Sequence, residues 1–74
     1  MLDIKTGDKI KVYDISETLI GEGTFKRVHL YPEDKKTQYE CEELSIVAEG
    51  EHIVEVNGKT YKVSEPKDWE KGIV

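Results

Sequence analysis

Four side chains spaced two residues apart could bind an anionic ligand or single-stranded nucleic acid. They belong to Phe25, Arg27, His29 and Tyr31, and Lys26 lies beside them. Alternate residues of an extended strand share a face, so the four would form an aromatic and cationic stripe. Aromatic rings stack on bases, and cationic side chains bind phosphate. A structural interpretation is favoured, in which Phe25 belongs to the core and the other three line a solvated face.

Metal binding or nucleophilic catalysis would need nitrogen and sulfur donors that converge in space. The candidates are His29, His52 and Cys41, and no spacing motif unites them. A single cysteine forms no intramolecular disulfide. The neighbouring carboxylates of residues 40–43 would need a desolvated pocket to act as general acids, which so small a domain rarely encloses. The sequence therefore predicts a protein that is not an enzyme and that has no metal site and no cofactor.

Acidic residues are concentrated in one part of the chain. The 74 residues have a net charge of −5, and residues 37–58 contain glutamates but no lysine or arginine. These glutamates are Glu40, Glu42, Glu43, Glu49, Glu51 and Glu55. They predict an acidic surface that favours a protein partner with a basic surface and repels nucleic acid. The same charge also serves solubility.

An all-β fold is predicted by apolar and polar residues that alternate with period two, most clearly in residues 52–63. Asn57-Gly58 is typical of the type I′ turn of a two-residue hairpin, because both positions take a positive φ. The resulting pairs are Val56 with Lys59, Val54 with Tyr61 and His52 with Val63. We expect the face with Val54, Val56, Tyr61 and Val63 to lie in the core.

The segment before this hairpin, residues 44–48, alternates in the same way. A three-residue loop at 49–51 would pair it with residues 52–56 and place Leu44, Ile46 and Ala48 in the core. That register sets Val47 opposite Ile53 on the outer face. The two side chains would form an exposed apolar spot, where they could anchor a partner.

The N-terminal half predicts a strand at residues 9–13 and a long strand at 18–31. Glycines 21 and 23 are expected to bend the long strand so that it serves two layers. Residues 32–36 connect it to a third strand, which is expected to carry a β-bulge near residues 42–43. In a regular strand, residues 39 and 41 would point to the face opposite that of residues 44 and 46. A bulge would let all four point to the core.

The segments Thr6-Gly7-Asp8-Lys9-Ile10-Lys11-Val12 and Leu19-Ile20-Gly21-Glu22-Gly23-Thr24-Phe25 together resemble the opening of SH3-like small β-barrel domains. The resemblance concerns the fold and implies a five-stranded antiparallel meander that closes into a barrel. The chain lacks the aromatic and acidic loop signature of peptide-binding SH3 domains. It also lacks the strongly basic loops of ribosome-associated members. No functional residues are therefore carried over from either group.

We expect one domain over residues 1–74, with its core in residues 6–65 and a short C-terminal extension, 66–74, in which Trp69 is a third apolar anchor. The expected function is that of a protein-interaction module. Small acidic proteins of phages or mobile elements often inhibit a basic host protein in this way. The alternatives are a small barrel that binds nucleic acid or an anionic ligand and a structural subunit of a homo-oligomer. No signal peptide and no membrane span are predicted, and a single cysteine fits the cytoplasm.

Overall fold

The structure of the chain is a computed structural model that describes residues 4–64, and it is built from β-strands. The strands are β1 Lys9–Asp14, β2 Leu19–Tyr31, β3 Lys36–Cys41, β4 Ser45–Glu49, β5 His52–Val56 and β6 Lys59–Val63. A single 3₁₀ turn, Pro32–Asp34, links β2 to β3. Within residues 4–64 no helix is long and apolar enough to cross a membrane. The expected all-β fold is confirmed.

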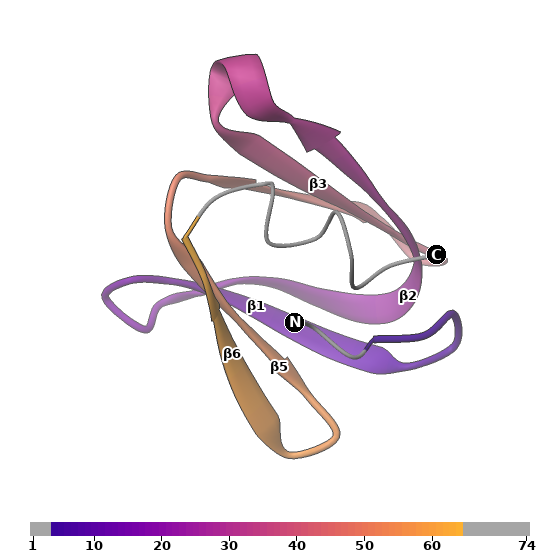
Figure 1. The fold of residues 1–74 in the computed structure, drawn as a ribbon. Helices are drawn as coiled ribbons and strands as arrows, with labels where there is room; N and C mark the ends of the chain where they lie inside the picture. The colour runs from indigo at the N-terminus through magenta and orange to yellow at the C-terminus, as the bar shows by residue number, and fades with distance from the viewer. Residues whose placement is uncertain (1–3, 65–74) are drawn as a thin grey trace.

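All neighbouring strands are antiparallel and form one six-stranded sheet in the order β4-β3-β2-β1-β5-β6. β1 to β4 make a meander, and the β5–β6 hairpin adds to the free side of β1. Figure 1 shows how β2 passes from the layer of β1, β5 and β6 to the layer of β3. The sheet is open, with β4 and β6 as its edges in the part of the chain that the structure describes. The predicted closed barrel is therefore replaced by a strongly bent open sheet.

The β5–β6 hairpin has the predicted turn and the predicted register. Asn57 and Gly58 have φ values of 52° and 78°. The pairs Val56–Lys59, Val54–Tyr61 and His52–Val63 are all present. The three valines are buried, and Tyr61 packs against the core from its rim. The turn residues and the alternation of apolar and polar residues were sufficient to predict this register, because the two strands are adjacent in sequence.

The predicted pairing of residues 44–48 with 52–56 is wrong. β4 pairs with β3, and β5 pairs with β1, so the loop at 49–51 connects two strands that are not neighbours. Val47 lies opposite Gln38, whereas Ile53 lies opposite Tyr13 and Lys62. The pairing with β1 sets Ile10 against Val56 and Val12 against Val54, and all four are buried. The expected apolar spot of Val47 with Ile53 therefore does not form.

The predicted third strand is two strands, which raises the count from five to six. In place of the expected bulge, the chain reverses at Glu42-Glu43, where the Cys41 N–H donates to the Leu44 carbonyl oxygen at 2.9 Å. The reversal lets the alternating residues of β3 and β4 face the same core without a bulge. Leu44 lies at the turn and is 44% exposed, so its predicted place in the core is also wrong.

The core lies between the two layers of the bent sheet. Its members are Ile4, Ile10, Val12, Phe25, Tyr39, Cys41, Ile46, Ala48, Val54, Val56 and Val63. Two polar side chains, Thr37 and His52, are buried among them. The extension 66–74 with Trp69 lies outside the described residues.

β2, which is predicted to bend at Gly21 and Gly23, contains a bulge and two closely packed glycines. The register shifts between Phe25 and Arg27, so Lys26 is the extra residue. At Gly23 a Cβ atom would lie 2.9 Å from the Cβ of Cys41 and 2.9 Å from Oε1 of Glu43. The bent strand therefore passes so close to the end of β3 that only glycine fits.

Gly23→Ala is expected to lower the free energy of unfolding by roughly 1–3 kcal/mol, because the Cβ of Cys41 cannot rotate away from the added methyl group. Gly21→Ala is the matched control, since its Cβ would meet only the side chain of Ile46, at 3.0 Å and beyond. We expect a smaller loss there. Urea unfolding of both variants provides the measurement. Equal stability of the Gly23 variant and the wild-type chain would contradict the close approach.

Candidate interaction surface

The bulge at Lys26 divides the predicted aromatic and cationic stripe. Phe25 is 2% exposed and belongs to the core. Beyond the bulge the side chains change face, so Arg27, His29 and Tyr31 lie on the outer face of β2, opposite Glu40, Gln38 and Lys36 of β3. The structure thus brings three of the four stripe residues together and removes Phe25 from the set.

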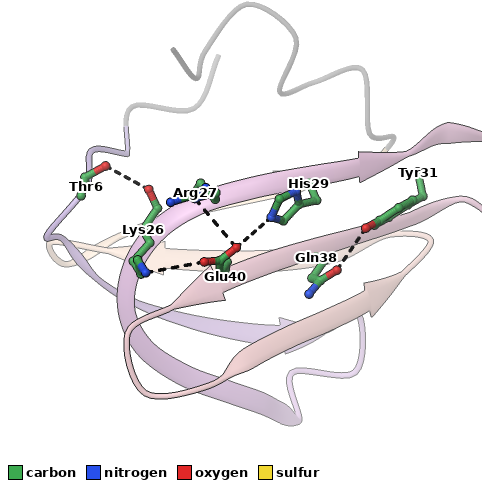
Figure 2. A network of polar contacts seen from close by, with 7 residues as sticks. All are labelled: Thr6, Lys26, Arg27, His29, Tyr31, Gln38 and Glu40. Atoms are coloured by element: carbon green, nitrogen blue, oxygen red, sulfur yellow. Dashed lines mark hydrogen bonds and ion pairs between the residues drawn. The ribbon is translucent and has the colours of Figure 1, made fainter.

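The outer face of β2 and β3 is organised around the carboxylate of Glu40 (Figure 2). His29 Nε2 lies 2.9 Å from Glu40 Oε1, Arg27 Nε lies 3.8 Å from the same oxygen, and Lys26 Nζ lies 3.6 Å from Oε2. The His29 hydrogen bond, with further attraction from Arg27 and Lys26, holds the pKa of Glu40 below its ordinary value of 4.5. Three basic side chains therefore already share one carboxylate of the protein.

This arrangement limits what the stripe can bind. An anionic ligand would have to compete with Glu40 for Arg27 and His29, and it would meet the negative charge of that carboxylate. The side chains are also well solvated, with 60% of Arg27 and 40% of His29 exposed. Exposed charge pairs of this kind contribute little to affinity or stability.

Next to the Glu40 group, Tyr31 and Val47 border a shallow hollow on the outer face. Asp34, Lys36 and Gln38 form the rest of its lining. The Tyr31 hydroxyl donates to Gln38 Oε1 at 3.3 Å (Figure 2). Tyr31 is 44% exposed and Val47 is 49% exposed, so both offer apolar area to a partner.

The structure does not gather the six predicted glutamates into one patch. Glu40 belongs to the group described above. Glu43 accepts hydrogen bonds from the Thr24 N–H at 2.7 Å and the Thr24 hydroxyl at 2.8 Å. Glu51 pairs with Lys62 at 3.1 Å. Three of the six thus have partners within the fold.

The other three glutamates have no ion pair within residues 4–64. Glu42 and Glu49 stand at the two ends of β4, with Lys36 across the ladder from Glu49. Glu55 lies on β5, opposite Lys11 of β1 and three strands away from β3 in the sheet. Glu42 and Glu49 are the two of these three glutamates that flank the exposed side chains of Leu44 and Val47 in the chain.

The two histidines and the cysteine lie in different surroundings. His52 is buried, with Nδ1 donating to the Gly50 carbonyl at 2.9 Å and Nε2 bonded to the Tyr39 hydroxyl. His29 is on the outer face. Cys41 is buried, and burial raises the pKa of its thiol, which disfavours the reactive thiolate. Residues 4–64 contain no group of three histidine, cysteine, aspartate or glutamate residues that could hold a metal ion.

The open edge of β4 is a feature that the sequence analysis missed. Its prediction would have required the knowledge that β5 pairs with β1 and leaves β4 with one neighbour. The strand Ser45–Glu49 contains no lysine, arginine or proline, which is the signal that remains visible in the sequence once the edge is known.

Acid is expected to destabilise the fold, with Glu43 as a main contributor. The hydrogen bonds from Thr24 hold the pKa of Glu43 below its ordinary value of 4.5. A carboxyl group with a lowered pKa in the folded state contributes stability above its unfolded pKa, and this contribution is lost as the pH falls through the folded value. The pKa of Asp14 is lowered in the same way, by the hydrogen bond from the Ser16 hydroxyl. The free energy of unfolding should therefore fall as the pH decreases below about 4.5.

Urea unfolding between pH 7 and pH 3 measures this dependence. Glu43→Gln should flatten the acid slope, while Glu22→Gln, which removes an exposed carboxylate of β2 that makes no hydrogen bond or ion pair within residues 4–64, should leave it as in the wild-type chain. Identical slopes for the two variants would contradict the assignment to Glu43.

Comparisons with known proteins found no match: no family model matches the chain, and neither a curated protein nor a solved structure does. The strand order and the contacts described above are therefore the basis of the proposals that follow.

Proposed function

We propose that the chain is a non-enzymatic protein-interaction module that binds a partner with a basic surface. The observation that carries the proposal is the β4 region, where exposed Leu44 and Val47 lie between Glu42 and Glu49 in the chain and these two carboxylates have no ion pair within residues 4–64. Apolar side chains supply contact area, and the flanking charges select and orient a partner of opposite sign. A free buried thiol at Cys41 suits a reducing compartment such as the cytoplasm.

The proposal favours proteins over nucleic acids for an electrostatic reason. Binding to a phosphate backbone depends on basic side chains that are available for it. Here Lys26, Arg27 and His29 surround Glu40, and the β4 region is acidic. Phosphate groups would be repelled by the carboxylates of Glu42 and Glu49, which flank the exposed side chains of Leu44 and Val47.

Affinity capture from the source cell tests the proposed function. The double variant Glu42→Lys with Glu49→Lys is the informative one, because neither carboxylate has an ion pair within residues 4–64. Circular dichroism verifies its fold, since Glu49→Lys places a second lysine opposite Lys36. Recovery of the partner should fall by about tenfold or more, since like charges then face each other. Reversal of Glu40 or Glu43 would be less informative, because both hold contacts within the protein.

The matched control reverses two exposed glutamates outside β4 and its adjoining turns, Glu17→Lys with Glu22→Lys, which changes the net charge equally. Its partner recovery should stay close to that of the wild-type chain. Equal recovery with both double variants would show that the β4 carboxylates do not select the partner, and the proposed function would then fail.

A further inference from the structure

The free edge of β4 presents backbone groups at alternate residues. Two hydrogen bonds bracket its ladder with β3, from the Cys41 N–H to the Leu44 carbonyl at 2.9 Å and from the Gly50 N–H to the Lys35 carbonyl at 2.7 Å. In an antiparallel pair, hydrogen-bonded and non-hydrogen-bonded residues alternate. The even-numbered residues of 44–50 therefore bond to β3. The N–H and C=O groups of Ser45, Val47 and Glu49 point away from the sheet.

This edge differs from the other edge of the sheet. β6 carries Lys59 and Lys62, and lysine on an edge strand discourages pairing with another chain. β4 carries neither lysine nor proline, its register with β3 is regular, and Val47 exposes 49% of its surface beside the outward-facing groups. The edge of β4 thus lacks three features that often protect a strand from pairing, namely lysine, proline and a β-bulge.

Two kinds of strand could pair with this edge, a second copy of β4 or an extended segment of another protein, and their charges distinguish them. Two copies of β4 paired antiparallel would set Ser45 of each copy against Glu49 of the other. This pairing would also bring together two segments that each carry Glu42 and Glu49 and no basic residue, so their net charges would repel. An extended segment with lysine or arginine beside these carboxylates would be attracted instead.

We propose that the β4 edge binds an extended, basic segment of a partner protein, which adds to the sheet as a further antiparallel or parallel strand next to Ser45, Val47 and Glu49. This inference rests on the proposed function and specifies its mode of recognition. Backbone hydrogen bonds would supply affinity, Val47 would pack beside an apolar residue of the segment, and Glu42 and Glu49 would select its basic residues.

Amide hydrogen exchange of the full chain tests whether the edge is free. The amides of Ser45, Val47 and Glu49 should exchange quickly, and those of Ile46 and Ala48 should exchange slowly, because only the second pair donates to β3. Slow exchange at all five positions in a monomer would mean that another part of this chain covers the edge. Slow exchange that depends on protein concentration would mean that a second copy covers it. Either result would overturn the inference.

Binding of a synthetic peptide tests the occupant. The probe alternates valine and threonine between lysine pairs, and its two controls carry glutamate in place of lysine or methyl groups on alternate backbone nitrogens. The lysine probe should bind and slow the exchange of the Ser45, Val47 and Glu49 amides. Both control peptides should bind at least about tenfold more weakly. Absence of binding by the lysine probe would overturn the inference.

Val47→Pro separates strand addition from charge attraction. Proline removes an N–H that does not bond to β3, and edge strands tolerate it at such positions. Val47→Thr is the matched control that keeps this N–H. Probe binding and partner capture should fall with the proline variant and persist with threonine, while circular dichroism and slow exchange at Ile46 verify the fold. Should charge reversal at Glu42 and Glu49 abolish capture while Val47→Pro does not, the proposed function would stand and strand addition would be wrong.

Discussion

Phe25→Ala is expected to lower the free energy of unfolding by roughly 3–5 kcal/mol, the range for a buried aromatic side chain truncated to alanine. Phe25 is 2% exposed, and it lies in the core, on the inner face of the bend in β2. A domain of this size has a total stability of only several kcal/mol, so the variant should be largely unfolded at room temperature. Urea unfolding followed by circular dichroism measures the loss.

Tyr31→Ala is the matched control at the far end of the same strand. Its ring is largely solvated, and its one described hydrogen bond, to Gln38, is long at 3.3 Å. The change in stability should lie within about 0.5 kcal/mol of zero. If Phe25→Ala were as stable as the wild-type chain, the ring would have to lie on the surface, as an intact binding stripe requires.

His52→Ala should have the second largest effect, a loss of roughly 2–4 kcal/mol. The imidazole is 1% exposed, and its removal leaves a cavity and deletes hydrogen bonds to the Tyr39 hydroxyl and the Gly50 carbonyl. Because a carbonyl only accepts, Nδ1 carries the proton. In the neutral ring, Nε2 therefore accepts the hydroxyl proton of Tyr39. Thermal and urea unfolding measure the loss.

Tyr39→Phe isolates the hydrogen bond from the packing, since it removes the hydroxyl and keeps the ring. It should cost about 1–2 kcal/mol. In the double variant with His52→Ala, the hydroxyl should contribute less than it does alone, because its bond to His52 is already lost. Strictly additive losses would show that the bond between the two side chains contributes nothing to stability.

The core and the candidate interaction surface are largely independent in this fold. Phe25, Tyr39 and His52 lie between the layers, whereas Glu42, Val47 and Glu49 lie on or beside an edge strand. Variants of the β4 edge should therefore change binding without unfolding the protein. This separation is what makes the charge-reversal and proline experiments interpretable.

Features that depend on neighbouring residues were predictable from the sequence. The turn at Asn57-Gly58 follows from the positive φ values that its residues accept, and the two-residue loop then determines the register of the strands on either side. The long strand ending at Tyr31 and its bend at the glycines were also confirmed. For the hairpin, the interactions that determine the structure lie within about a dozen residues of one another.

The position of Phe25 needed a longer-range determinant. Regular alternation would put Phe25 on the same face as Arg27 and His29. The apolar side chains of Val28 and Leu30 indicate that the inward face changes along the strand, but not at which residue. The bulge at Lys26 exists because β2 must pair with β1 before it and with β3 after it. A binding stripe of four residues is thereby reduced to three on the surface and one in the core.

By itself, the sequence determined the all-β class, the turn between β5 and β6 and the inward face of these two strands, because these follow from local backbone preference and alternation. Only the tertiary structure decided which strands are neighbours. Residues 44–48 alternate well enough to pair with 52–56 or with β3, and the choice depends on β1, which offers Ile10 and Val12 to β5 across more than forty residues of sequence. That distant pairing places β5 between β1 and β6, leaves β4 with β3 as its one neighbour within residues 4–64, and so creates the edge on which we place the partner.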